Sequence, residues 1–194
     1  MAAMRDGKMT SLYSRRGFIG AMGATTALAA CGNGVGSQGG ATIDSRVDGT
    51  RDYLFSRYPG TTDLADKSYG ILWMPLITKA GLWFGGAYGR GALRVDNVTV
   101  DYYSATQASF GPQIGAQQYA HALFFMTPEA LRKFRSGPGW SAGADLEYAF
   151  MDDAGAVAAD TLTSLDPVIA LVFGQQGLIA GASLEGTKYT RIIP

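Results

Sequence analysis

Cysteine and histidine are almost missing from this chain of 194 residues, which contains one of each. A single cysteine, Cys31, excludes an intramolecular disulfide and any metal cluster built from several cysteines. A single histidine, His121, excludes zinc motifs that require paired histidines. The chain must therefore hold its core by packing alone. A domain of this length can do so, because it buries roughly 70% of the surface that its unfolded chain exposes.

An excess of charge of one sign is lacking as well, since 16 basic residues balance 16 acidic ones. Residues 1–30 contain four of the basic residues and one of the acidic residues, so residues 31–194 carry 12 basic and 15 acidic residues, a net charge of −3. Proteins that bind nucleic acid usually present a basic face or stripe. We therefore expect no nucleic-acid partner.

The first thirty residues are expected to be an export signal. Their apolar run, residues 17–30, is diluted by glycine and threonine and falls below the ~20 residues of a membrane-spanning helix. The preceding sequence SRRGFI, which contains Arg15 and Arg16, resembles the twin-arginine export signature. The sequence LAAC that ends at Cys31 resembles a lipobox. We therefore expect lipid attachment at Cys31; the alternatives are an ordinary signal with an incidental cysteine and an uncleaved anchor.

A lipidated Cys31 would anchor the mature chain stably in the cell envelope, because about two membrane signals suffice for stable attachment. Gly32 follows the cysteine in place of the aspartate associated with inner-membrane retention, which favours the periplasmic face of the outer membrane. Residues 31–41 form a Gly-rich segment, expected to be a flexible tether that spans very roughly 15–20 Å. The folded domain is then expected over residues 42–194.

Strand-forming patterns dominate that domain. Two helices are expected first, over 43–58 and 62–69, the second capped by Thr61 or Thr62. A third is expected from Thr127, its N-cap, to Arg135. The expected strands are 71–77 with a bend or an edge at Pro75, then 82–95, 98–109, 113–126, 144–151, 168–173, 178–184 and 188–193. The pattern predicts an α+β fold with a mainly antiparallel, curved, Gly-rich sheet that is sandwich- or barrel-like, with N-terminal helices and one helix inserted between strands.

Glycine is frequent among large aromatics between residues 79 and 117. Glycine weakens a strand, so it is usually kept where a bulge, another backbone or a ligand comes close. The first helix carries aspartates at 44, 48 and 52, with arginines between them, which predicts a solvated face with local ion pairs.

Residues typical of catalysis are scarce. His121 lies in an apolar segment, where a buried, hydrogen-bonded histidine is the expected role, and no partner for general-base work is visible in the sequence. The Gly86, Gly89 and Gly91 spacing is the reverse of a dinucleotide-binding motif, and no helix pattern follows it. We therefore expect neither enzymatic activity nor a cofactor or metal.

Cationic and aromatic residues of the sheet are the candidate binding residues. Because side chains alternate along a strand, Tyr88, Arg90 and Arg94 should project on one side, with Arg90 and Arg94 placed to hold a phosphate. The full candidate set for lipid binding is Lys79, Phe84, Tyr88, Arg90, Arg94, Lys188 and Arg191. Arg132, Lys133 and Arg135 are assigned to helix-end electrostatics. The alternative is that these cations are scattered solvent-facing charges.

Short Gly- and aromatic-rich motifs recur over most of residues 42–194: Lys79-Ala80-Gly81, FGGAYGRGAL at 84–93, Tyr102-Tyr103, SFGPQIGAQ at 109–117, FMTPEAL at 125–131, and 177–192. Together they resemble the SYLF domain. The resemblance implies lipid binding, since animal members bind phosphoinositides, and the yeast branch also binds actin. It carries over no catalytic residues. Asp101 and the acidic first helix depart from the family pattern.

The resemblance and the export signal lead to two hypotheses. The first is an envelope lipoprotein whose domain binds anionic phospholipid without catalysis. The alternative is a structural or protein-interaction lipoprotein with an envelope protein partner and no lipid ligand.

Overall fold

The computed structural model describes residues 37–82, 84–110, 115–143, 147–150, 166–177 and 184–194. The predicted export signal and Cys31 lie outside these residues, as does all but the last residue of the predicted strand 178–184. Within the described residues, no helix is both long and apolar enough to cross a bilayer.

Helices and strands follow one another in nearly the predicted order. They are α2 (Gly39–Arg57), α3 (Thr61–Lys67), β1 (Gly70–Leu82), β2 (Phe84–Val95), β3 (Val98–Phe110), β4 (Gly115–Phe125), α4 (Pro128–Ser136), β5 (Trp140–Ser141), β6 (Glu147–Phe150), β7 (Val168–Gly177) and β8 (Lys188–Ile192). The helix α2 begins four residues before the predicted start, so the end of the predicted tether is helical. The two-residue strand β5 was not predicted.

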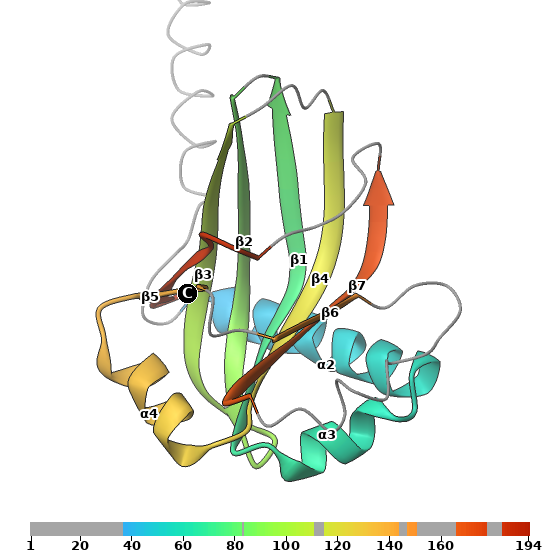
Figure 1. Cartoon of the computed structure of the whole chain (residues 1–194), viewed down its shortest axis with the longest axis vertical. Coiled ribbons are helices and arrows are strands. Elements are labelled where there is room, and N and C mark those ends of the chain that lie inside the picture. Colours follow the sequence, from blue (N-terminus) through green and yellow to red (C-terminus); the bar gives the residue numbers. More distant parts are fainter. Residues whose placement is uncertain (1–36, 83, 111–114, 144–146, 151–165, 178–183) are drawn as a thin grey trace, which may run out of the picture. The chain divides into compact units, whose positions relative to one another are not determined.

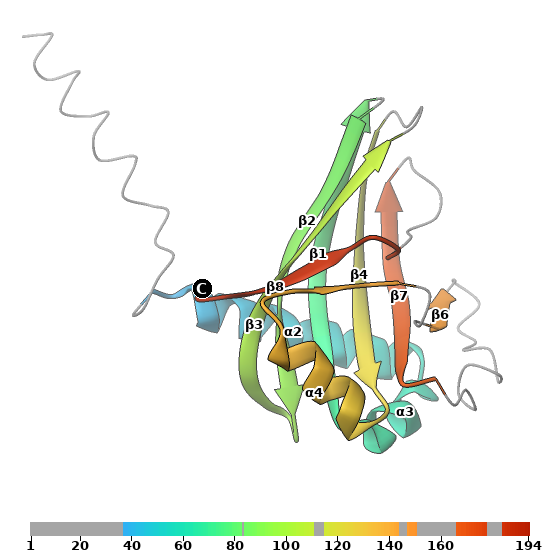
Figure 2. The same ribbon diagram turned by 60° about the vertical axis from the view of Figure 1, so that its left-hand side comes forward.

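The strands form one sheet in the order β5-β8-β3-β2-β1-β4-β7-β6. Neighbouring strands are antiparallel, except for β6, which runs parallel to β7. The helix α2 crosses one face of the central strands, and α4 lies by the opposite face (Figures 1 and 2). The predicted α+β class and the mainly antiparallel sheet are confirmed.

The sheet is strongly curled, as one contact on its inner face demonstrates. His121 on β4 and Tyr189 on β8 are separated by three intervening strands in the sheet order. In a flat sheet their backbones would be about 19 Å apart, from a strand spacing near 4.8 Å. The hydroxyl of Tyr189 nevertheless lies 2.8 Å from Nε2 of His121. The curl closes the sheet part-way toward a barrel, so the barrel-like form of the prediction holds and the two-layered sandwich does not.

Two hydrophobic clusters fill the two faces of the sheet. Ile43, Val47 and Leu54 of α2 pack on the outer face, against residues such as Trp73 and Phe124. On the inner face, Phe134 of α4 lies among the buried residues of β1, β3, β4, β7 and β8. The outer cluster fixes α2 and the inner cluster fixes α4.

A bulge interrupts the central strand β1 at Pro75. The register with β2 shifts between Trp73 and Leu76, and the register with β4 shifts between Met74 and Ile77. Proline has no N–H to donate, so inside a sheet it is confined to edges or bulges. The predicted bend is therefore a bulge in an interior strand, and Pro75 does not mark an edge.

Two glycines of β2 leave room for the bulged backbone of β1. A Cβ atom at Gly91 would overlap the carbonyl oxygen of Trp73 and lie 2.6 Å from Sδ of Met74. A Cβ atom at Gly89 would overlap the carbonyl oxygen of Leu76. The Gly-rich segment thus serves close backbone approach, as the sequence predicts.

The two-residue connection implied by the expected strands 82–95 and 98–109 is confirmed, and so is the predicted cap of α4. Asp96 and Asn97 join the two strands with φ of 50° and 63°, the left-handed conformation that two-residue hairpin turns require. The hydroxyl oxygen of Thr127 accepts a hydrogen bond from the backbone N–H of Ala130 at 3.1 Å.

The predicted cap of α3 is wrong. Gly60 is the N-cap, with no side-chain hydrogen bond. The hydroxyls of Thr61 and Thr62 instead donate back to the carbonyl oxygens of Tyr58 and Pro59, both at 2.7 Å.

Candidate functional site

The seven predicted lipid-binding residues do not form one site. Tyr88, Arg90 and Arg94 share the outer face of the sheet, as alternation along β2 predicts. Lys79 is buried on the inner face, where its cross-strand neighbours are Ala87 and Gln117. The two candidates on β8, Lys188 and Arg191, are separated from β2 by β3.

Arg94 is a structural residue of the interface between α2 and the sheet. It is only 8% exposed, and its Nη1 donates to Oδ1 of Asp48 at 2.7 Å. Asp44, one turn earlier, accepts hydrogen bonds from the hydroxyls of Thr99 at 2.8 Å and Tyr102 at 2.7 Å. Arg94 is therefore not presented to a phosphate, contrary to its predicted role. Two of the three aspartates also bond to the sheet, where a solvated face was predicted. The predicted local ion pairs are present, between Arg51 and both Asp48 and Asp52.

The electrostatics of this contact are visible in two shifted pKa values. The hydrogen bond from Arg94 lowers the pKa of Asp48 below its usual value. Burial, together with the hydrogen bond to Asp44, raises the pKa of Tyr102 to about 12. The carboxylate of Asp48 and the hydroxyl of Tyr102 therefore keep their protonation states at neutral pH.

A groove on the outer face brings together two of the predicted residues. Two adjoining cavities, of about 550 and 210 Å³, both reach Arg46 of α2 and the bulged residues Pro75 and Leu76. The smaller one is also lined by Tyr88 and Arg90. We call the surface formed by these five residues the bulge groove. It places two guanidinium groups beside an apolar ridge created by the bulge.

Exposed apolar side chains lie in the bulge groove and on the same face of the sheet. Leu76 is 40% exposed and Tyr88 is 54% exposed. Phe84, further along the same side of β2, is 73% exposed. Tyr53 of α2 is also exposed and stacks on Phe173 at a ring-centroid distance of 6.3 Å. A soluble domain exposes single apolar residues routinely, but a gathered set beside cations marks an interaction surface.

Arg191 belongs to a different cluster, at the opposite face of the sheet. Its Nε lies 3.4 Å from Oδ1 of Asp101, and Nε of Arg135 donates to Oδ2 of the same carboxylate at 2.9 Å. The two arginines line a cavity beside α4, which we call the α4 groove and define by Tyr69, Val95, Leu131, Arg135 and Arg191. Arg135 thus does more than complement the end of a helix, the role assigned to it from the sequence.

His121 is fully buried, as expected from its apolar surroundings. Its Nε2 is hydrogen-bonded to the hydroxyl of Tyr189, and burial lowers its pKa to about 3. The imidazole is therefore neutral at ordinary pH and opens onto neither groove.

Sequence reasoning missed Arg46 and the roles of Asp44 and Asp48. A signal for the aspartates was present, because each directly follows a residue of the buried face of α2, Ile43 or Val47. A side chain at the border of a buried face can reach the sheet. No comparable signal identified Arg46, which lines the same two cavities as Pro75 and Leu76 of the bulge.

Comparison with family models gives one match. Residues 106–191 match the family Ysc84, described as Las17-binding protein actin regulator. The matched segment runs from within β3 to within β8; it includes α4 and Arg191 but not the bulge groove. Comparison with curated proteins gives no match. The match identifies a Ysc84 domain, which is the SYLF domain, within residues 106–191.

Proposed function

We propose that this protein is an envelope lipoprotein whose domain binds anionic phospholipid at the bulge groove and catalyses no reaction. The observation that carries the proposal is the cavity that Arg46 and Arg90 line together with Pro75 and the exposed Leu76. A phospholipid at a membrane surface presents the matching pair of chemistries, an anionic phosphate beside apolar chains.

Arginine suits the phosphate, because its planar guanidinium can donate two parallel hydrogen bonds to phosphate oxygens. Leu76 and Phe84 would contact acyl chains, and Tyr88 would lie at the boundary, where an aromatic ring with a polar end is favoured. Residues 31–194 carry a net charge of −3, so general attraction to an anionic membrane is weak. Binding should therefore depend on the local arginine pair.

The predicted anchor at Cys31 supports the same role. A domain tethered to the bilayer meets lipid at a high effective concentration, so even a weak groove would be occupied. The proposed location is the periplasmic face of the outer membrane, reached by the twin-arginine route. The family supports a lipid-binding or actin-binding type of domain, and of these two we propose lipid as the ligand.

Vesicle binding tests the proposal. We expect the full chain with Cys31→Ser to float with vesicles rich in phosphatidylglycerol and less with vesicles of phosphatidylcholine. Replacing Arg46 and Arg90 together by Gln should weaken binding to the anionic vesicles at least tenfold, about 1.4 kcal/mol. The matched control replaces Lys67 and Lys133 by Gln, which removes the same charge at exposed positions away from the groove.

Equal losses in the two double variants would mean that total charge governs binding, and the bulge groove would be rejected. No binding by the unsubstituted protein, together with no co-purified lipid in native mass spectrometry, would reject the lipid ligand. The alternative, a protein-interaction module of the envelope, would then be the better proposal. The description of the family as a Las17-binding protein actin regulator supports that second candidate.

A further inference from the structure

We propose that the α4 groove binds a small amphipathic anion, a molecule with one carboxylate or phosphate at the end of an apolar body. The site is separate from the bulge groove, and nothing in the proposed function depends on it. It lies between α4, the start of β1, the end of β2 and β8, and its cavity measures about 520 Å³. That volume is within the roughly 300–1,000 Å³ typical of small-ligand sites.

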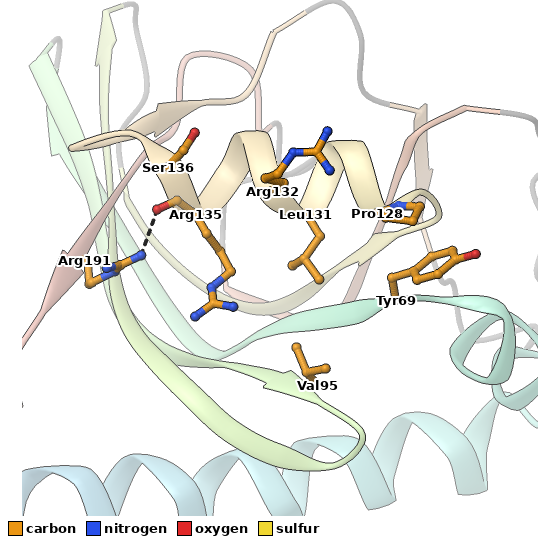
Figure 3. Close-up of a pocket in the computed structure, with 8 residues that line it drawn as sticks. All are labelled: Tyr69, Val95, Pro128, Leu131, Arg132, Arg135, Ser136 and Arg191. Carbon is orange, nitrogen blue, oxygen red and sulfur yellow. Dashed lines mark hydrogen bonds between the residues drawn. The ribbon is translucent and has the colours of Figure 1, made fainter.

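Arg135 supplies an oriented cationic group. Figure 3 shows its side chain extending from α4 across the groove toward the sheet. The carboxylate of Asp101, whose side chain is 14% exposed, accepts from Nε at 2.9 Å. No other hydrogen bond of this guanidinium is formed within the described part of the chain. The pairing at Nε fixes the plane of the fork and leaves its terminal nitrogens for a ligand, the geometry that suits carboxylate and phosphate.

Arg191 gives the site an excess of positive charge. Its Nε lies 3.4 Å from Oδ1 of Asp101, and its Nη2 donates to the backbone carbonyl oxygen of Arg135 at 2.8 Å. Two guanidinium groups thus share one carboxylate, so one positive charge remains uncompensated there. Arg132, on the rim, is paired with Glu129 and adds no net charge. A ligand with a single anionic group matches this balance.

The remainder of the groove is apolar. Leu131, Val95 and Pro128 line the side away from Arg191, with the half-exposed ring of Tyr69 beside Pro128 (Figure 3). An inorganic anion would leave the apolar side of the groove exposed to water. An apolar molecule without a charge would leave the guanidinium excess uncompensated. The two halves of the lining together therefore select an amphipathic anion.

Calorimetric titration of the full chain with Cys31→Ser tests the inference, with decanoate below its micelle concentration as the probe. We expect one decanoate bound per chain. Decanol, which has the same chain without the charge, and acetate, which has the charge without the chain, should each bind at least tenfold more weakly. Decyl phosphate should bind as decanoate does, since the guanidinium fork accepts either anion.

Two variants locate the site. Arg135→Gln should weaken decanoate binding at least tenfold, whereas Lys133→Gln, an equal loss of charge on the same helix, should leave it unchanged. Tyr69→Ala should weaken decanoate but not acetate. The variants with Arg46 and Arg90 replaced should bind decanoate normally, which separates this site from the bulge groove.

The inference is overturned if decanoate does not bind at millimolar concentration, or if decanol or acetate binds as tightly as decanoate. It is also overturned if Arg135→Gln, shown to be folded by its circular dichroism and melting temperature, binds decanoate as the unsubstituted chain does.

Discussion

Nη1 of Arg94 lies 2.7 Å from Oδ1 of Asp48, although the two residues are 46 positions apart in the chain. This ion pair joins the end of β2 to the middle of α2 and is continued by Asp44, which bonds to Thr99 and Tyr102 on β3. The helix is thus fixed on the outer face by packing and by a polar contact at its edge. The position of α2 matters because Arg46, between the two aspartates, forms one side of the bulge groove.

Replacing Arg94 should cost stability rather than lipid binding. We expect Arg94→Met to lower the free energy of unfolding by about 2 kcal/mol, the scale of lost hydrogen bonds between charged groups. Urea denaturation measures this loss. The folded variant should still float with anionic vesicles, whereas the double replacement of Arg46 and Arg90 should not. If Arg94→Met has normal stability but no longer binds vesicles, Arg94 is part of the lipid site after all.

The ion pair between Arg94 and Asp48 also predicts that stability depends on pH. The pKa of Asp48 is lowered in the folded state, so its contribution to stability is fully present above the unfolded pKa, near 3.9. That contribution is lost as the pH falls through the lower folded value. We therefore expect Asp48→Asn to be less stable than the unsubstituted chain at pH 6 and closer to it at pH 3, by urea denaturation at both pH values. A difference that does not narrow in acid would contradict the lowered pKa.

Burial of His121 predicts a second pH dependence of the free energy of unfolding, at higher pH than that of Asp48. The folded pKa is about 3 and the unfolded pKa is about 6.5, so between these values the unfolded chain binds a proton that the folded chain does not. The free energy of unfolding should therefore fall as the pH is lowered from 7 to 5, with a limiting slope of about 1.4 kcal/mol per pH unit. His121→Phe should remove this slope.

Tyr189→Phe is the control for that experiment. It removes the hydrogen bond to His121 but keeps the buried imidazole, so the slope between pH 7 and 5 should remain. A slope that survives in His121→Phe would have to come from another group.

Glycines of β2 should differ sharply in their tolerance of a methyl group. At Gly91 an added Cβ overlaps the carbonyl oxygen of Trp73, so Gly91→Ala should destabilise by about 1–3 kcal/mol, the usual cost of overpacking. At Gly86 the nearest atom to an added Cβ is the carbonyl oxygen of Gln107 at 3.4 Å, an ordinary contact. Gly86→Ala should leave the melting temperature nearly unchanged. Similar losses at both positions would mean that the bulge of β1 is not what requires glycine.

Lipid attachment at Cys31 is tested in cells. Cys31→Ser should abolish acylation and move the protein from the membrane fraction to the soluble fraction. Replacing Arg15 and Arg16 by Lys should block export and leave the precursor uncleaved. A Cys31→Ser protein that matures and stays in the membrane fraction would refute the lipobox interpretation.

Local sequence patterns determined the type and order of nearly all the described helices and strands. Alternating apolar residues, the Asp96-Asn97 turn and the Thr127 cap act over a few residues, so each could be predicted without knowing the fold. Alternation along β2 likewise placed Tyr88, Arg90 and Arg94 on one face. The bend at Pro75 was predictable because proline lacks an N–H.

Only the tertiary structure decided which of those residues line a surface groove and which bond to other residues of the chain. Arg90 and Arg94 have the same sequence pattern, but α2 covers Arg94 and leaves Arg90 in a groove. The curl of the sheet brings β8 over the inner face, and the position of α4 beside β3 and β8 joins Arg135, Asp101 and Arg191. These contacts depend on how elements pack at long range. Periodicity within a single segment carries no information about that packing.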